Sequence, residues 1–137
     1  MRAAVLIGCC AQLVWFFGCI VTYRVGRRVL VDGMGVKSAE FGMFCVFAAA
    51  LALFVFVPGV GKWALRVVLA FWLVIQFFCH WYYTIFGATE KKLRGYNSCF
   101  RDTIRVIPAS DTRVIPDLYH MVLHLMLCTN LTLILLY

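Results

Sequence analysis

The chain has 137 residues, of which 64% are hydrophobic and only 14% are charged, and its formal net charge at pH 7 is +7. Soluble domains carry about 25% charged residues, so this composition excludes an ordinary water-soluble domain and indicates an integral membrane protein. The apolar runs lack the strand-like alternation of a membrane β-barrel. We expect a single domain over residues 1–137.

Four apolar runs are long enough to cross a bilayer as helices, which takes about 20 residues each. They cover residues 3–22, 39–57, 63–86 and 118–137, and none contains proline. The sequence therefore predicts an all-α integral membrane protein with four transmembrane helices. The first run follows Arg2 as a signal peptide would, but we interpret it as an uncleaved helix.

The first two connections carry turn and cap signals. In the first, Gly33 and Gly35 favour turns, Ser38 is the predicted N-cap of the second helix, and Glu40 lies in its first turn. The second connection, PGVGK, predicts a tight turn. Helices two and three should therefore be antiparallel neighbours.

The third connection contains a predicted amphipathic helix. Its apolar residues recur at steps of three or four, and basic and polar residues fall opposite them. Such a helix is suited to the cytoplasmic membrane interface, although Gly95 weakens it. The apolar stripe consists of Leu93, Tyr96, Phe100, Ile104 and Ile107.

Lysine and arginine are distributed unevenly among the connections. One side has only Arg2, Lys62 and Arg66, so the positive-inside rule predicts that both termini lie outside and that connections one and three are cytoplasmic. The cations of those two connections are Arg24, Arg27, Arg28, Lys37, Lys91, Lys92, Arg94, Arg101, Arg105 and Arg113.

Topology alone can explain these charges, but a basic cytoplasmic face can also bind an anionic lipid or a nucleotide. No glycine-rich phosphate loop or RNA-binding motif accompanies them. The candidate ligand-binding residues are Arg24, Arg27, Arg28, Lys91, Lys92, Arg94, Arg101 and Arg105.

All three histidines are predicted to lie in one layer near the cytoplasmic side. His80 precedes the end of helix three, and His120 and His124 share one face of helix four. Pro116 is expected in the first turn of helix four, with Asp117 at the positive end of its dipole. The layer can hold a haem or a transition metal, or handle protons for a quinone.

The alternative for these histidines is structural, with each imidazole bonding a neighbour or reaching the interface. The chain has no H-E-x-x-H motif and no obvious fourth ligand, so we favour this alternative and expect no cofactor. The sizeable polar residues elsewhere in the spans are Gln12, Gln76 and Asn130, which predict amide hydrogen bonds between helices.

Three classes of function remain. An oligomeric pore or channel-like effector with a basic cytoplasmic face is favoured, because mid-membrane acids, nucleophile motifs and cofactor signatures are missing. The second class is a membrane anchor or enzyme that binds haem, metal or quinone through the histidine layer. The third is a structural subunit of a larger membrane complex. Partners should be the lipid bilayer and other copies or subunits, and an enzyme is disfavoured.

Overall fold

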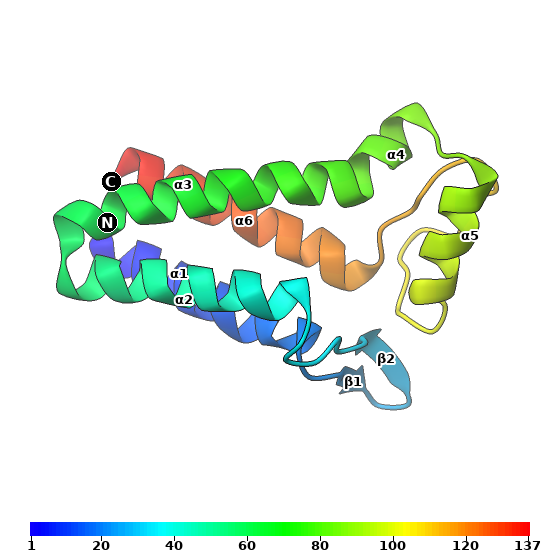
Figure 1. Ribbon diagram of the computed structural model, residues 1–137, viewed down its shortest axis with the longest axis horizontal. Helices are drawn as coiled ribbons and strands as arrows, with labels where there is room; N and C mark the ends of the chain where they lie inside the picture. The colour runs from blue at the N-terminus through cyan, green and yellow to red at the C-terminus, as the bar shows by residue number, and fades with distance from the viewer.

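The computed structural model describes residues 1–137 and confirms the predicted helical membrane fold (Figure 1). Four helical segments are long and apolar enough to cross a membrane: Arg2–Cys19, Ala39–Phe56, Pro58–Phe86 and Leu118–Leu136. The two termini lie at one end of the bundle (Figure 1). A small β-hairpin and the short helix between the third and fourth spans lie towards the other end, which we call the loop end.

Two of the four spans are built from more than one helical segment. The first is α1 followed by a 3-10 turn, and the third is α3 followed by a π-helical segment and α4. The bounds are α1 Arg2–Phe16, the 3-10 turn Phe17–Cys19, β1 Tyr23–Val25, β2 Arg28–Val31, α2 Ala39–Phe56, α3 Pro58–Gln76, the π-helical segment Phe77–Trp81, α4 Tyr82–Phe86, α5 Glu90–Cys99 and α6 Leu118–Leu136.

The β-hairpin was not expected from the sequence. It takes up residues that the sequence assigns to the first connection, with Val25 paired to Arg28 across the turn. Gly26 has a φ of 61° there, a conformation that glycine adopts without strain. After the hairpin, the Ser38 side chain accepts a hydrogen bond of 3.2 Å from the backbone N–H of Phe41, which confirms the predicted cap.

Helices α2 and α3 are antiparallel neighbours, as predicted, but the turn between them is shorter than expected. Helix α3 begins at Pro58 because proline suits the first turn of a helix, so Val57 alone separates the two helices. At Gly61 the backbones are so close that an added Cβ would collide with Phe54 and Leu53 backbone atoms. This glycine therefore allows the two spans to pack.

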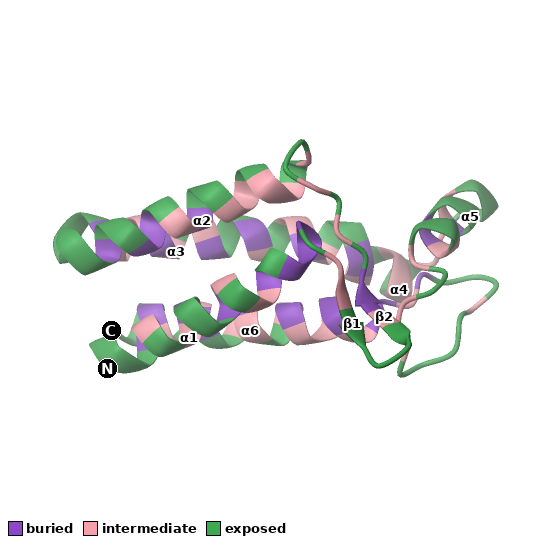
Figure 2. Ribbon diagram, turned by 90° about the horizontal axis from the view of Figure 1, so that it is seen from below, coloured by how far each residue is buried: buried purple, intermediate pink, exposed green.

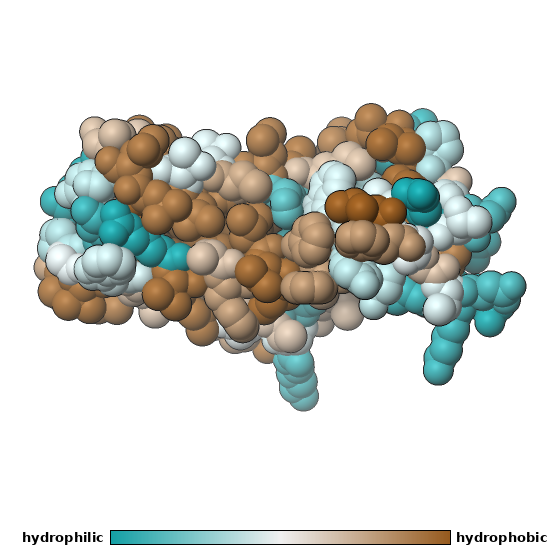
Figure 3. All heavy atoms as spheres, turned by 90° about the horizontal axis from the view of Figure 1, so that it is seen from above, coloured by the Kyte–Doolittle hydropathy of each residue, from teal (hydrophilic) through white to brown (hydrophobic).

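The bundle interior is filled by apolar side chains. Trp72 of α3 packs edge-on against Phe16 of α1 and Phe47 of α2, with ring centroids 4.3 and 5.4 Å away. Buried residues lie mainly on the sides of the helices that face one another (Figure 2). Hydrophobic atoms cover most of the bundle surface in the view of Figure 3, as lipid contact requires, and hydrophilic atoms gather towards its ends.

Helices α1 and α6 are joined by polar contacts as well as by packing. The Trp15 indole N–H donates to the Tyr119 carbonyl at 3.2 Å, and the Tyr119 hydroxyl donates to the Trp15 carbonyl at 2.8 Å. Deeper in the bundle, the Asn130 amide donates to Gln12 Oε1 at 2.7 Å. This bond confirms the predicted amide pairing for two of the three amides.

The cations at the terminal end have structural partners. Arg2 donates to the Val55 carbonyl at the end of α2, at 2.8 Å. Arg66 donates to the carbonyls of Ile134 and Leu135 at the end of α6, at 3.1 and 3.3 Å. Both side chains therefore satisfy carbonyls that a helix end leaves unpaired.

Candidate functional site

A cavity of about 850 Å³ lies at the loop end, between α2, α3, α5 and the segment after the hairpin. Apolar side chains from the bundle line one part of it, namely Phe16, Met43, Trp72 and Ile75. Charged side chains line another part, namely Asp32, Glu40, Lys91 and Lys92. The cavity can therefore receive a molecule with both apolar and polar parts.

His80 and His120 lie together on the wall of this cavity. Their rings are stacked, with centroids 4.2 Å apart and an interplanar angle of 30°. His80 belongs to the π-helical segment and His120 to the first turns of α6. Single π-turns inside α-helices occur often at functional sites. Each histidine is only 7% exposed.

The Nδ1 atoms of both rings are occupied by hydrogen bonds. His120 Nδ1 lies 2.6 Å from Asp117 Oδ1, and His80 Nδ1 lies 2.7 Å from the Tyr96 hydroxyl. The Nε2 atoms have no hydrogen-bond partner in the protein. Each of the two cavity-lining rings thus keeps one nitrogen that has no partner in the protein.

Asp117 is both the N-cap of α6 and the partner of His120. Its Oδ1 also accepts a hydrogen bond of 3.0 Å from the His120 backbone N–H, while Oδ2 is buried without a partner. Burial opposes ionisation, but the hydrogen bonds from His120 outweigh it and hold the pKa of Asp117 below its usual value. Pro116 precedes this cap, so its predicted place in the first turn of the helix is wrong.

Tyr96 reaches His80 from α5. This helix begins at its N-cap Thr89, whose hydroxyl accepts from the Lys92 backbone N–H, and it buries Leu93 and Tyr96. Burial raises the pKa of Tyr96 above its usual value, so the phenol stays protonated. Tyr96 belongs to the predicted apolar stripe, and its hydrogen bond with His80 is visible only in the folded structure.

The predicted amphipathic helix is shorter than its apolar stripe. Helix α5 ends at Cys99, and Ile104 and Ile107 lie in the loop beyond it. Arg105 folds back and donates to Asn97 Oδ1 and to the Phe100 carbonyl, at 3.2 and 3.3 Å. These contacts pair polar groups at the end of the helix. Ile107 precedes a proline, and the residue before a proline disfavours the helical conformation, so the helix does not continue to Ile107.

Gln76 is the third polar residue of the cavity wall. It lies on the same side of the third span as His80, is 9% exposed, and its amide makes no hydrogen bond within the protein. The predicted hydrogen bond from this residue to another helix is therefore absent. The sequence identifies Gln76 as polar, but only the structure shows that its amide is left for another partner.

His124 is separate from the other two histidines. Its ring lies 5.4 Å from that of Trp81, and its Nδ1 is buried without a partner. No group of three or more histidine, cysteine, aspartate or glutamate side chains is arranged to hold a metal ion. The structure thus brings His80 and His120 together and leaves His124 apart, and ligation of a haem or a metal stays a prediction.

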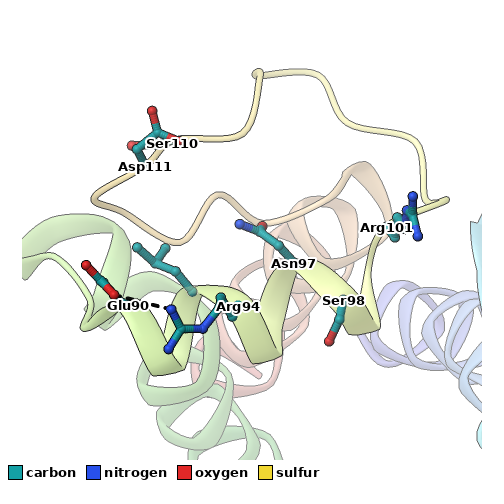
Figure 4. A pocket seen from close by; sticks show the side chains of 8 residues that line it. Glu90, Arg94, Asn97, Ser98, Arg101, Ser110 and Asp111 are labelled. Atoms are coloured by element: carbon teal, nitrogen blue, oxygen red, sulfur yellow. Dashed lines mark hydrogen bonds and ion pairs between the residues drawn. The ribbon is translucent and has the colours of Figure 1, made fainter.

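The predicted basic residues do not line one common pocket. Lys91 and Lys92 line the large cavity, whereas Arg94 and Arg101 line a second pocket of about 530 Å³ between α5 and the following loop (Figure 4). This pocket has mixed charge, and Arg94 pairs with Glu90 at 3.2 Å. Its lining consists of Glu90, Leu93, Arg94, Asn97, Ser98, Arg101, Ser110 and Asp111.

Among the remaining predicted cations, the side chain of Arg113 has hydrogen-bond partners in the protein and those of three arginines have none. Arg113 donates to the carbonyls of Thr84 and Ile85 at the end of α4, at 2.9 and 3.1 Å. Arg24, Arg27 and Arg28 of the hairpin form no hydrogen bond or ion pair through their side chains, and they line neither pocket. Binding of an anionic ligand to this basic set stays a prediction.

Comparison of the chain with protein-family models, curated proteins and solved structures finds no match. The candidate site therefore rests on its own geometry. Its members are His80, His120, Gln76, Tyr96 and Asp117.

Proposed function

We propose that this multi-pass membrane protein binds a lipid-soluble ligand with a hydrogen-bonding headgroup in the cavity at the loop end. One observation supports this function above the others: Gln76, His80 and His120, which are 9%, 7% and 7% exposed, face the same cavity with polar atoms that have no protein partner. These atoms are not fully enclosed by the protein, so a ligand in the cavity can reach them and form hydrogen bonds with them.

The apolar lining supports a lipid-soluble ligand. Trp72 and Phe16 are each 2% exposed and form part of the cavity wall, so the cavity reaches the packed interior of the bundle. An apolar chain or ring placed there is removed from water, which stabilises it by about 25 cal/mol per Å² of apolar surface. The polar headgroup then lies beside the histidines. Quinone binding, one of the predicted alternatives, is a special case of this function.

Binding can be tested with radiolabelled 4-nonylphenol, a neutral molecule with an apolar tail and a polar head. We expect about one bound molecule per protein in nanodiscs, above the amount taken up by empty nanodiscs. Gly95→Leu should abolish this binding, since Gly95 lines the cavity and an added Cβ there meets no atom within 4 Å. The leucine side chain therefore enters the cavity space and competes with the probe, and its Cβ meets no backbone that would have to move.

Gly42→Leu is the matched control. Gly42 lies in a helix, an added Cβ there also meets no atom within 4 Å, and the residue does not line the cavity. Binding should survive this substitution. If neither the wild type nor the control binds more probe than empty nanodiscs do, the proposed function is wrong.

We also propose that both termini lie outside and that the loop end is cytoplasmic, as the charge distribution predicts. Cys99, at the end of α5, is exposed and lies beyond the candidate spans. A membrane-impermeant maleimide should therefore label Cys99 only after intact cells are opened. Cys99→Ser identifies the signal of Cys99 among those of the other thiols. Labelling of Cys99 in intact cells would show that the proposed topology is wrong.

The oligomeric pore and the structural subunit stay as predictions of lower rank. The interior of the single bundle is filled by fully buried Phe47, Leu65, Leu69, Leu123 and Leu127. Any conducting path would consequently have to run between copies of the chain. Ion flux through liposomes that contain the purified protein separates the pore from the other two functions.

A further inference from the structure

The contact with Asp117 determines which nitrogen of His120 carries hydrogen. A carboxylate can only accept hydrogen bonds, so the 2.6 Å contact to Nδ1 requires the hydrogen on that nitrogen. Asp117 is ionised, since its pKa lies below the usual value. In the neutral form of an imidazole with its hydrogen on Nδ1, Nε2 is the hydrogen-bond acceptor, and His120 lines the cavity.

The contact with Tyr96 gives His80 the opposite arrangement. The buried Tyr96 hydroxyl lies 2.7 Å from His80 Nδ1 and has no other hydrogen-bond partner. If Nδ1 donated to the phenol oxygen, the phenol hydrogen would stay buried and unpaired, which costs about 1–3 kcal/mol. The phenol therefore donates to Nδ1. The hydrogen of His80 is then on Nε2, which acts as a donor towards the cavity.

From this pair we infer that the ligand's headgroup is a hydroxyl group, carried by a lipid-soluble phenol or alcohol, which donates to His120 and accepts from His80. A hydroxyl oxygen is the smallest group that does both, and its hydrogen bonds are about 2.8 Å long. The ring centroids lie 4.2 Å apart, so the inferred ligand is one whose hydroxyl oxygen lies between the two Nε2 atoms and bonds both. The inference rests on the proposed ligand-binding function.

Other headgroups fit the pair less well. An ether or a ketone can accept from His80 but offers no hydrogen to His120. A carboxylate or a phosphate would face the lone pair of His120 with the buried carboxylate of Asp117 behind it, whose Oδ2 is itself unpaired. The free amide of Gln76 on the same wall can bond a second polar atom of the ligand.

A pair of probes tests this inference on the wild-type protein. Unlabelled 4-nonylphenol and its methyl ether, 4-nonylanisole, are compared as competitors of radiolabelled 4-nonylphenol in nanodiscs. The two molecules share the apolar tail and ring, but the ether has lost the hydrogen. We expect the phenol to bind at least about tenfold more tightly, which corresponds to the loss of about one buried hydrogen bond.

Two variants locate the effect. His120→Phe keeps a ring in the stack and removes the acceptor, so phenol and anisole should compete equally well. Tyr96→Phe removes the hydrogen bond that fixes the His80 tautomer, so the preference for the phenol should fall. If His120→Phe does not fold, the wild-type probe pair and Tyr96→Phe still decide the question.

The outcomes separate the inference from the function on which it rests. If saturable binding is absent for both probes, the cavity is no ligand site and the proposed function fails. If both bind with equal affinity to the wild type, the cavity binds lipid-soluble molecules but the hydroxyl inference is wrong. A phenol preference that persists unchanged in both variants would also overturn the assignment to the histidine pair.

Discussion

Gly61→Ala is expected to lower the free energy of unfolding by about 3 kcal/mol, the upper end of the usual range for overpacking. A Cβ at this position would overlap backbone atoms of Phe54 and Leu53, which cannot move aside as a flexible side chain can. Helices α2 and α3 must then separate, and packing is lost along both. Unfolding of the purified protein by SDS titration, followed by circular dichroism, measures the change.

Gly59→Ala is the matched control for this substitution. It lies in the first turns of the same helix, and an added Cβ there meets no atom within 4 Å. Alanine is favoured over glycine in a helix by up to about 1 kcal/mol, so this variant should be as stable as the wild type or more so. Equal stability of the two variants would show that the close approach of α2 and α3 is not required.

Asp117→Ala should also lower the free energy of unfolding by about 3 kcal/mol. The loss of an N-cap costs about 1 kcal/mol, and leaving the buried Nδ1–H of His120 without an acceptor adds about 1–3 kcal/mol. Asp117→Asn is the control, because one amide oxygen can accept both bonds that Oδ1 now accepts. If alanine and asparagine cost the same, the carboxylate and not its hydrogen bonds stabilises the fold.

The pH dependence of stability follows from the same group. Because folding lowers the pKa of Asp117, its ionisation contributes stability that is fully present above the unfolded pKa of about 3.9 and is lost as the pH falls through the folded pKa. The difference in stability between the wild type and Asp117→Asn should therefore shrink on acidification below about pH 4. A difference that is independent of pH would contradict the lowered pKa.

The helical framework is predictable because bilayer thickness fixes the length of a span. The four apolar runs lie where the spans are, and Ser38 has the role that its position before the second run indicates. The hairpin also has a local signal, since Gly26 and Arg27 form a two-residue turn between valine-rich segments. That signal is weak beside the longer apolar runs, and it competes with an extension of helix one.

The site itself depends on contacts that no local pattern specifies. Helical rise places His80 and His120 at similar depth, but the π-helical segment alters the direction in which His80 points. The partner of His80 comes from α5, 16 residues along the chain, where periodicity indicates only that Tyr96 is apolar. His120 and His124 share a helix face, but only His120 lies against His80.

Photoaffinity labelling tests most directly whether the cavity binds a lipid-soluble ligand. A phenol that carries a diazirine in its tail is irradiated with the protein in nanodiscs, and the adducts are located by mass spectrometry. We predict adducts on Met43, Trp72 and Ile75, which line the cavity, and their loss in the presence of excess 4-nonylphenol. Adducts confined to the outward-facing Phe71 and Val74 on the same helix, unaffected by the competitor, would show that the phenol dissolves in the lipid and that the cavity is not its site.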